Sequence, residues 1–169
     1  MEPIRVYLTG SDEDAQAAVA DWLHQRHGFA RVTLFSGRRD AQRVRSVDPA
    51  RLAALALEHG DRRADLVIDG VRTPAEAEHL RARGVLGVRV ASPARLLRGQ
   101  QPDGLAGDAP DVAVATVPVD LVLLPSREPL AHDRDLRLLV ARLAVLHATR
   151  ATAARVPLVR LARGVRQGR

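Results

Sequence analysis

Residues 4–23, IRVYLTGSDEDAQAAVADWL, run from a mainly apolar segment through a single Gly into a stretch with helical periodicity. The apolar character of residues 4–9 predicts a buried strand. Residues 13–26 place apolar side chains at helical spacing, which predicts a helix that packs against that strand. A strand that turns through Gly10 into a helix is the arrangement in which a phosphate-binding loop occurs.

The phosphate-binding pattern G-x-x-x-x-G-K-[ST] surrounds phosphate with backbone N–H groups and a Lys, and it places a hydroxyl beside Mg²⁺. Counted from Gly10, this spacing puts Ala15 at the second Gly, Gln16 at the Lys and Ala17 at the Ser or Thr. Only the first Gly is present. If the loop bound a nucleotide, we would expect Gly10, Ser11 and Gln16 to line it.

Three carboxylates, Asp12, Glu13 and Asp14, lie in the middle of this loop, where a triphosphate needs positive charge. Repulsion between like charges amounts to about 1 kcal/mol for each pair ~4 Å apart, even in water. The same acids suit the start of a helix, with Ser11 or Asp12 as N-cap and carboxylates at the positive end of the helix dipole. On either interpretation, the loop is poorly suited to ATP.

The rest of the chain alternates between predicted strands and predicted helices. The segments that carry these predictions are strands at 30–35, 65–69, 85–91 and 119–124, helices opened by Asp48-Pro49 and by Thr73-Pro74, and a long helix at roughly 133–149. Together with the first strand and helix, they predict an α/β fold with about five parallel strands covered by helices on both faces. Ligands of such sheets bind at the carboxyl ends of the strands, where Gly10, Asp69, Arg95 and Arg98 are expected.

Length and composition restrict the protein class. The 169 residues suffice for one domain with its own core, and the absence of Cys excludes disulfides and thiolate metal sites. No apolar run reaches the ~18 residues of a membrane span, and the N-terminus lacks a signal-peptide pattern, so we expect a cytoplasmic protein that does not bind membranes. The His and Ser residues form neither an H-E-x-x-H nor a G-x-S-x-G pattern, so neither that metal site nor a Ser hydrolase is favoured.

All 26 basic residues are Arg, and they are unevenly distributed. Residues 150–169 hold six Arg and no acid, whereas the preceding residues hold 20 Arg and 20 acids. We therefore divide the chain into an α/β domain at 1–149 and a basic tail at 150–169. The tail is interpreted as a solvated end, as a segment that docks on a partner protein, or as a nucleic-acid-binding segment whose affinity falls with salt.

The order of these motifs resembles the P-loop nucleoside and deoxynucleoside monophosphate kinases, in particular the phage-type deoxynucleoside monophosphate kinase family. Residues 19–23 (VADWL) and 27–29 (HGF) match that family's motifs after the phosphate-binding loop in the same register. Residues 69–76 reproduce its D-x-R followed by Pro and Glu, and residues 85–98 are similar to its Arg-containing lid. The resemblance spans most of residues 4–146 and implies the three-layer P-loop NTPase fold.

In this family, Asp69 would be the Mg²⁺ partner, Arg72 would contact the acceptor phosphate, and Arg95 and Arg98 would belong to the lid. The structural alternatives are that Asp69 ends a strand, that Arg72 is a solvated turn residue, and that the two lid Arg belong to a solvated basic face. Glu76 stands three residues after Thr73 in capping-box spacing, which favours a helix cap over a catalyst.

The sequence departs from the family pattern at the residues that carry out the family's chemistry. Phosphoryl transfer depends on loop amides, Lys and Mg²⁺ around the phosphates, and residues 15–17 lack the Gly, the Lys and the hydroxyl together. The leading hypothesis is therefore a degenerate kinase homologue that acts as a binding or assembly module, with a protein partner or a second copy and without a cofactor. The alternatives are a kinase that uses Arg in place of Lys with ATP and Mg²⁺, and a nucleic-acid-associated protein acting through residues 150–169.

Overall fold

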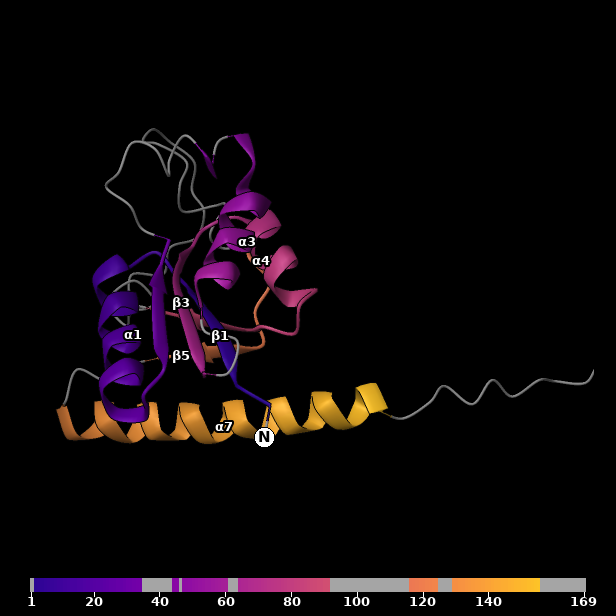
Figure 1. Ribbon diagram of the computed structural model, residues 1–169. Helices are drawn as coiled ribbons and strands as arrows, with labels where there is room; N and C mark the ends of the chain where they lie inside the picture. The colour runs from indigo at the N-terminus through magenta and orange to yellow at the C-terminus, as the bar shows by residue number, and fades with distance from the viewer. Residues whose placement is uncertain are drawn as a thin grey trace, which may run out of the picture.

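A computed structural model of the chain describes residues 2–34, 44–45, 47–60, 64–91, 116–124 and 129–155 (Figure 1). The described chain contains five strands and four helices, which alternate from β1 to β4 and end with β5 and α7. The strands are β1 (Arg5–Thr9), β2 (Ala30–Thr33), β3 (Leu66–Val71), β4 (Leu86–Val90) and β5 (Leu121–Leu123). The helices are α1 (Glu13–His27), α3 (Pro49–His59), α4 (Pro74–Arg81) and α7 (Pro129–Arg155).

The strands form one parallel sheet in the order β2-β3-β1-β4-β5, which confirms the predicted α/β architecture. β1 lies at the centre, with Val6 level with Val67 of β3 on one side and with Leu86 of β4 on the other. Each parallel pair requires a crossover, and the described helices lie in the connections from β1 to β2, β2 to β3 and β3 to β4. The central position of β1 explains why its burial is nearly complete.

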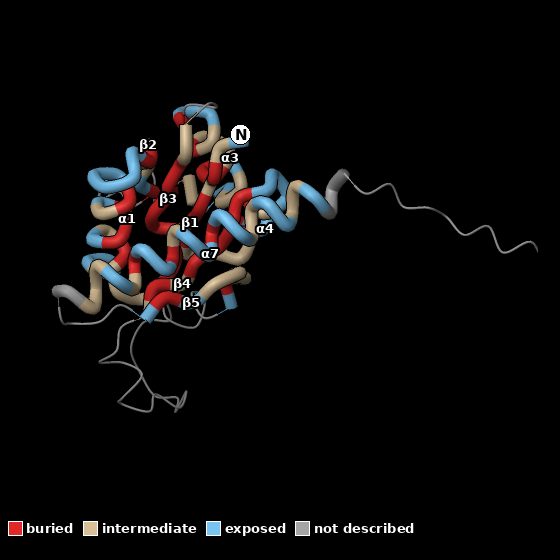
Figure 2. The backbone as a smooth tube through the Cα atoms, turned by 90° about the horizontal axis from the view of Figure 1, so that it is seen from below, coloured by how far each residue is buried: buried red, intermediate tan, exposed pale blue. Residues whose placement is uncertain are grey.

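Helices cover both faces of the sheet, and each face buries its own apolar cluster (Figure 1). One cluster joins α1 and α7 to the sheet through side chains such as Leu8, Leu23 and Leu143. The other joins α3 and α4 to the opposite face through side chains such as Ile68 and Leu80. Figure 2 shows the buried residues concentrated on the strands and on the inner sides of the helices. The fold is therefore a three-layer sandwich.

The predicted helix signals are confirmed. Asp12 caps α1 by accepting from the backbone N–H of Ala15, and Gly28 ends α1 in the left-handed conformation at φ 70°. Asp48 caps α3, and Pro49 occupies the first turn. Thr73 and Glu76 form both hydrogen bonds of the capping box at the start of α4. Local side chains thus determine where these three helices begin.

Two elements are longer than the sequence pattern predicts. β3 continues two residues past Asp69, through Gly70 and Val71, and its pairing with β1 shifts register between Tyr7 and Thr9. α7 extends beyond the predicted 133–149 at both ends, to Pro129 and Arg155. The sequence between these two ends contains no Gly and no further Pro, so nothing interrupts the helix. Within the described ranges, no helix has both the length and the apolar composition of a membrane span.

An ionic cluster at the amino end of β5 fixes α7 to the sheet. Asp120 accepts from the backbone N–H of Gly87 at 2.7 Å and pairs with Arg81 of α4 and Arg150 of α7. The buried Tyr7 hydroxyl donates to the carbonyl of Pro118. Burial raises the pKa of Tyr7 to about 12. Arg150, the first residue of the predicted tail, is thus part of α7, and residues 156–169 lie outside the described residues.

Candidate functional site

The candidate site lies at the carboxyl ends of β1 and β3, where the chain passes from Thr9 into α1. The connection is short, because α1 already begins at Glu13. Gly10 crosses the end of β4 so closely that a Cβ there would lie 2.2 Å from the carbonyl oxygen of Val90. A side chain at this position would collide with backbone, so the turn requires Gly.

Asp12 occupies two backbone N–H groups that a phosphate would use, one through its side chain and one through its carbonyl. Asp12 accepts from the backbone N–H of Ala15 at 2.9 Å, and its carbonyl accepts from the backbone N–H of Gln16 at 3.1 Å. These two N–H groups stand at the second-Gly and Lys positions of the phosphate-binding spacing. They are therefore directed into the cap of α1 and are not available to an anion.

The side chain of Gln16 folds back onto the connection between β1 and α1. Its side chain is fully buried, and its amide Nε2 donates to the carbonyl of Gly10 at 2.8 Å, with a longer contact of 3.4 Å to the carbonyl of Asp12. Its Oε1 is buried and has no hydrogen-bond partner among the residues that the structure describes. A Lys at this position reaches outward to phosphate. Here the side chain instead returns to the loop's own backbone and fills the space.

The first turn of α1 is joined to the segment that follows β3. Arg72 forms an ion pair with Glu13, and its backbone N–H donates to Glu76 at 2.8 Å. The cation expected to contact an acceptor phosphate is thus paired with one of the three acids of the loop. This pair also attaches the start of α1 to the neighbouring strand.

Asp69 lies at zero exposure on β3, and its carboxylate forms an ion pair with Arg31 of β2 at 2.6 Å. Arg31 also pairs with Asp21 of α1, so it links the two elements. Burial opposes the charge of Arg31, but hydrogen bonds and attraction from both carboxylates outweigh it and raise the pKa of Arg31 above its usual value. Asp69 is therefore engaged in a structural ion pair at the place expected of a Mg²⁺ partner.

Glu76 is buried and bonded from three sides. Its carboxylate accepts from the backbone N–H groups of Arg72 and Thr73 and pairs with Arg45 at 2.6 Å. Arg45 also donates to the carbonyl of Gly70 at 2.9 Å. The predicted helix cap is confirmed, and the same carboxylate also neutralises a half-buried Arg.

The structure brings most of the residues predicted from the sequence to this edge. They are Gly10, Ser11 and Gln16 in the loop, Asp69 at the carboxyl end of β3, and Arg72 immediately after it. Arg95 and Arg98 lie outside the described residues. Sequence reasoning missed Arg31 and Arg45, which form the ion pairs with Asp69 and Glu76. Arg31 could have been noticed in the sequence, because it is a charged residue inside the predicted apolar strand at 30–35.

These contacts test whether ATP and Mg²⁺ fit the site. A triphosphate needs free N–H groups and cations, and Mg²⁺ needs carboxylate or hydroxyl oxygens. The amides of Ala15 and Gln16 are bonded to Asp12, and the cation of Arg72 is paired with Glu13. Asp69 is paired with Arg31 through Oδ2, while its Oδ1 has no hydrogen-bond partner among the described residues. The residues present do not fit a triphosphate in this conformation.

One comparison with a solved structure supports the fold. No protein-family model matches the chain, and no curated protein matches it. A gluconokinase from Sinorhizobium meliloti 1021 is structurally similar, with a TM-score of 0.60 over 90% of this chain and 98% of that chain at 16% sequence identity. A de novo designed protein with the P-loop NTPase fold gives a TM-score of 0.41 over 88% of this chain and 96% of that chain at 8% identity. The likeness to the gluconokinase shows the fold alone, a parallel α/β fold shared with that kinase.

Proposed function

We propose that this P-loop kinase-like protein does not perform ordinary ATP-dependent phosphoryl transfer and acts as a binding or assembly module. The observation that carries the proposal is the loop closed by its own side chains, with Gln16 on the carbonyl of Gly10 and Asp12 on the backbone N–H of Ala15. The fold is retained, but the backbone and side-chain groups that would hold phosphate form hydrogen bonds within the loop instead.

Charge supports the same conclusion. Three described cations at this edge have a carboxylate partner: Arg31 pairs with Asp69, Arg45 with Glu76 and Arg72 with Glu13. A triphosphate entering here would have to displace these carboxylates from their partners. Breaking either pair that holds a fully buried carboxylate, Arg31–Asp69 or Arg45–Glu76, costs about 3–5 kcal/mol, which would weaken nucleotide binding. The pair of Arg72 and Glu13 is exposed, so its separation costs at most about 1 kcal/mol.

A phosphoryl-transfer assay tests the proposal. The full chain is incubated with ATP, Mg²⁺ and, in turn, each ribo- and deoxyribonucleoside monophosphate, and diphosphate products are separated by chromatography. We expect no product above a protein-free control, while an active nucleoside monophosphate kinase in parallel reactions verifies the substrates. Product formation that scales with the concentration of this chain would overturn the proposal.

The second candidate is a nucleoside monophosphate kinase that uses Arg in place of the missing Lys, with ATP and Mg²⁺ as cofactors. The observation that favours it is the position of Arg72 beside the first turn of α1, where it pairs with Glu13. Releasing that pair by Glu13→Gln would direct Arg72 toward a phosphate and raise the rate, whereas Arg72→Ala and Arg95→Ala would lower it. Under the leading proposal, all these variants and the wild type are equally inactive.

A further inference from the structure

The side of α7 that faces away from the sheet carries a row of exposed residues that are mostly apolar or small. The opposite side packs into the core through Leu136, Leu139 and Leu143. In the exposed row, Leu138 is 48% exposed and Val145, one heptad later, is 65% exposed. The row repeats at steps of three and four residues, and all of its members are exposed. We name it the outer row of α7, and it consists of Leu138, Ala141, Val145, Ala148 and Thr152.

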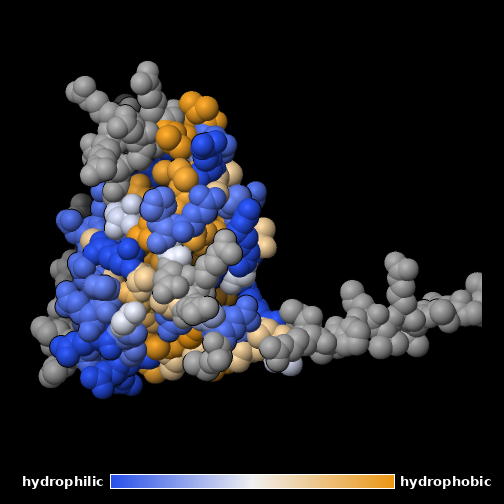
Figure 3. Space-filling view, viewed as in Figure 1, coloured by the Kyte–Doolittle hydropathy of each residue, from blue (hydrophilic) through white to orange (hydrophobic). Residues whose placement is uncertain are grey.

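An alternation of three and four residues is the spacing with which one helix packs against a second helix. At about 3.6 residues per turn and about 1.5 Å per residue, it keeps the outer row on one side of α7 over a length of about 20 Å. Hydrophobic residues interrupt the hydrophilic surface along the lower edge of the molecule in Figure 3, where α7 lies in Figure 1. A helix with one apolar side packs on one partner, so a second side of this kind indicates a second partner.

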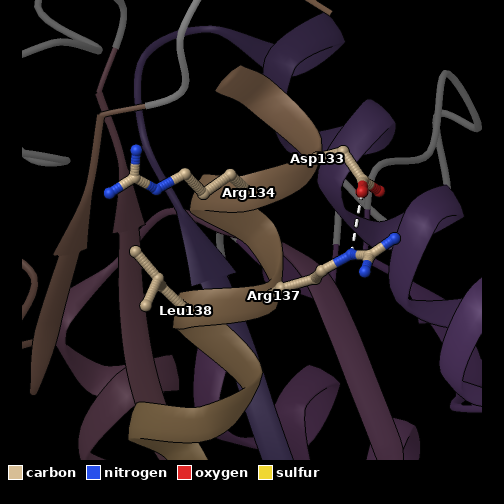
Figure 4. A pocket seen from close by; sticks show the side chains of 4 residues that line it. All are labelled: Asp133, Arg134, Arg137 and Leu138. Carbon is tan, nitrogen blue, oxygen red and sulfur yellow. Dashed lines mark ion pairs between the residues drawn. The ribbon is translucent and has the colours of Figure 1, made fainter. Parts of the chain in front are cut away.

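Arginine side chains surround the N-terminal part of the outer row. Figure 4 shows that Arg134 and Leu138 project to one side of α7, while Asp133 and Arg137 project to another and form an ion pair. These four side chains line a hollow of about 400 Å³. Arg142 follows Arg137 by five residues, which is about 140° around the helix, so these two cations lie on either side of the row. The outer row therefore has cations at its N-terminal end and along both sides.

The carboxylates near these cations already have partners within the chain. Asp133 forms the ion pair of Figure 4 and also accepts from the indole Nε1 of Trp22 at 3.1 Å. Asp135 has an interaction within the chain as well. Arg134 and Arg142, both exposed, form no ion pair with a carboxylate of the described residues. A second copy of the chain would offer the same cations to this surface, whereas a partner rich in Asp or Glu would neutralise them.

We propose that the outer row of α7 binds an amphipathic helix of another protein, with large apolar side chains along its contact row and Asp or Glu beside them. Ala141 lies between Leu138 and Val145 in the row, and its small side chain leaves room for a large apolar side chain of the partner. The partner's carboxylates face Arg134 and Arg142, as opposite charges do beside the apolar rows of paired helices. This inference names the kind of partner for the binding role proposed above, and it rests on that role.

Isothermal titration calorimetry of the full chain with two synthetic peptides tests the proposal. The acidic probe is a peptide of three heptads with Leu at the apolar positions and Glu at the flanking positions, and the basic probe carries Lys in place of each Glu. We expect saturable binding of the acidic probe with a dissociation constant of roughly 10–100 μM, and binding of the basic probe that is weaker by about tenfold or more. Circular dichroism should show that the acidic probe gains helix when it binds, because its contact row forms only in a helix.

Variants of the full chain locate the binding surface. Leu138→Asp should raise the dissociation constant of the acidic probe about tenfold or more, because it removes an apolar contact and adds a like charge. Arg142→Glu should weaken binding of the acidic probe about fivefold and strengthen binding of the basic probe, because it reverses a flanking charge. Val47→Asp and Arg51→Glu are the matched controls. Both residues are exposed, just before and within α3 on the opposite face of the sheet, so these changes should leave both dissociation constants unchanged. Circular dichroism verifies that each variant is folded.

The inference would be overturned by an acidic probe that does not bind the wild type, by equal binding of the two probes, or by controls that change binding as much as Leu138→Asp and Arg142→Glu do. Vesicles of phosphatidylcholine with added phosphatidylserine, tested by cosedimentation, provide the membrane alternative. Binding to these vesicles by a wild type that does not bind the acidic probe would assign the outer row to a membrane surface and not to a helix.

The same samples separate this inference from the proposed function. Phosphoryl transfer by the wild type would overturn the proposed lack of catalysis, whatever the peptide titrations show. An inactive wild type that does not bind the acidic probe would overturn the assignment of a helical partner alone.

Discussion

The replacement Glu76→Ala should destabilise the protein far more than its place near the start of a short helix suggests. Glu76 is fully buried, and its carboxylate accepts from the backbone N–H groups of Arg72 and Thr73 at 2.8 and 3.1 Å. The other oxygen pairs with Arg45 at 2.6 Å. Truncation removes all three contacts and leaves Arg45, whose side chain is only 17% exposed, without its carboxylate.

The magnitude follows from these contacts. Removing one partner of a buried ion pair costs about 3–5 kcal/mol, and losing a helix cap costs about 1 kcal/mol. The two losses overlap because one side chain makes both contacts, so we expect a decrease of about 4 kcal/mol in the free energy of unfolding. For a domain of this size, each kcal/mol lowers the melting temperature by about 2–4 °C, which predicts a decrease of roughly 8–16 °C.

Urea unfolding followed by circular dichroism measures this decrease. Glu78→Ala on the same helix is the matched control, since Glu78 is exposed and its removal should change the free energy of unfolding by less than about 0.5 kcal/mol. Glu76→Gln, which retains the size and one acceptor oxygen, should lie between the two. If Glu76→Ala and Glu78→Ala differ by less than about 1 kcal/mol, the ion pair with Arg45 does not stabilise the fold as the structure indicates.

Three further outcomes are expected. Gly87→Ala would place a Cβ 2.4 Å from the Tyr7 hydroxyl, so urea unfolding should show a loss of about 1–3 kcal/mol. Burial raises the pKa of Tyr7 from 10.0 to about 12, so its stabilising contribution is complete below pH 10 and is lost as the pH rises toward 12. Because Tyr7 is the only Tyr, phenolate absorbance during a pH titration reports it alone, and a midpoint near 10 would contradict its burial. A double-mutant cycle of Arg31→Ala and Asp69→Ala should give a coupling free energy of about 1–3 kcal/mol, and additive losses would contradict their ion pair.

Much of the fold was predictable because its signals are local. Asp48-Pro49 and Thr73-Pro74 mark helix starts through their own caps, so these boundaries match the structure closely. The extension of β3 through Val71 was not predictable in this way. A Gly after Asp69 is typical of a turn, whereas the pairing of Val71 with Thr9 of β1 keeps this segment extended.

The site was predictable in its location but not in its contacts. The spacing from Gly10 identified residues 15–17 as the altered positions, and the strand pattern placed Asp69 at the same edge. The turn of Gln16 back to the carbonyl of Gly10 depends on the backbone of the loop, which the sequence does not describe. The pair between Arg31 and Asp69 depends on β2 lying beside β3, which follows from the order of strands and not from any local pattern.

The central claim is that the loop after β1 is closed by Gln16 and Asp12 and does not hold a triphosphate. Isothermal titration calorimetry of the full chain with ATP and Mg²⁺ measures this most directly, with an active P-loop kinase as positive control. The closed loop predicts no saturable heat for the wild type up to millimolar ATP. Saturable binding with a micromolar dissociation constant would contradict it.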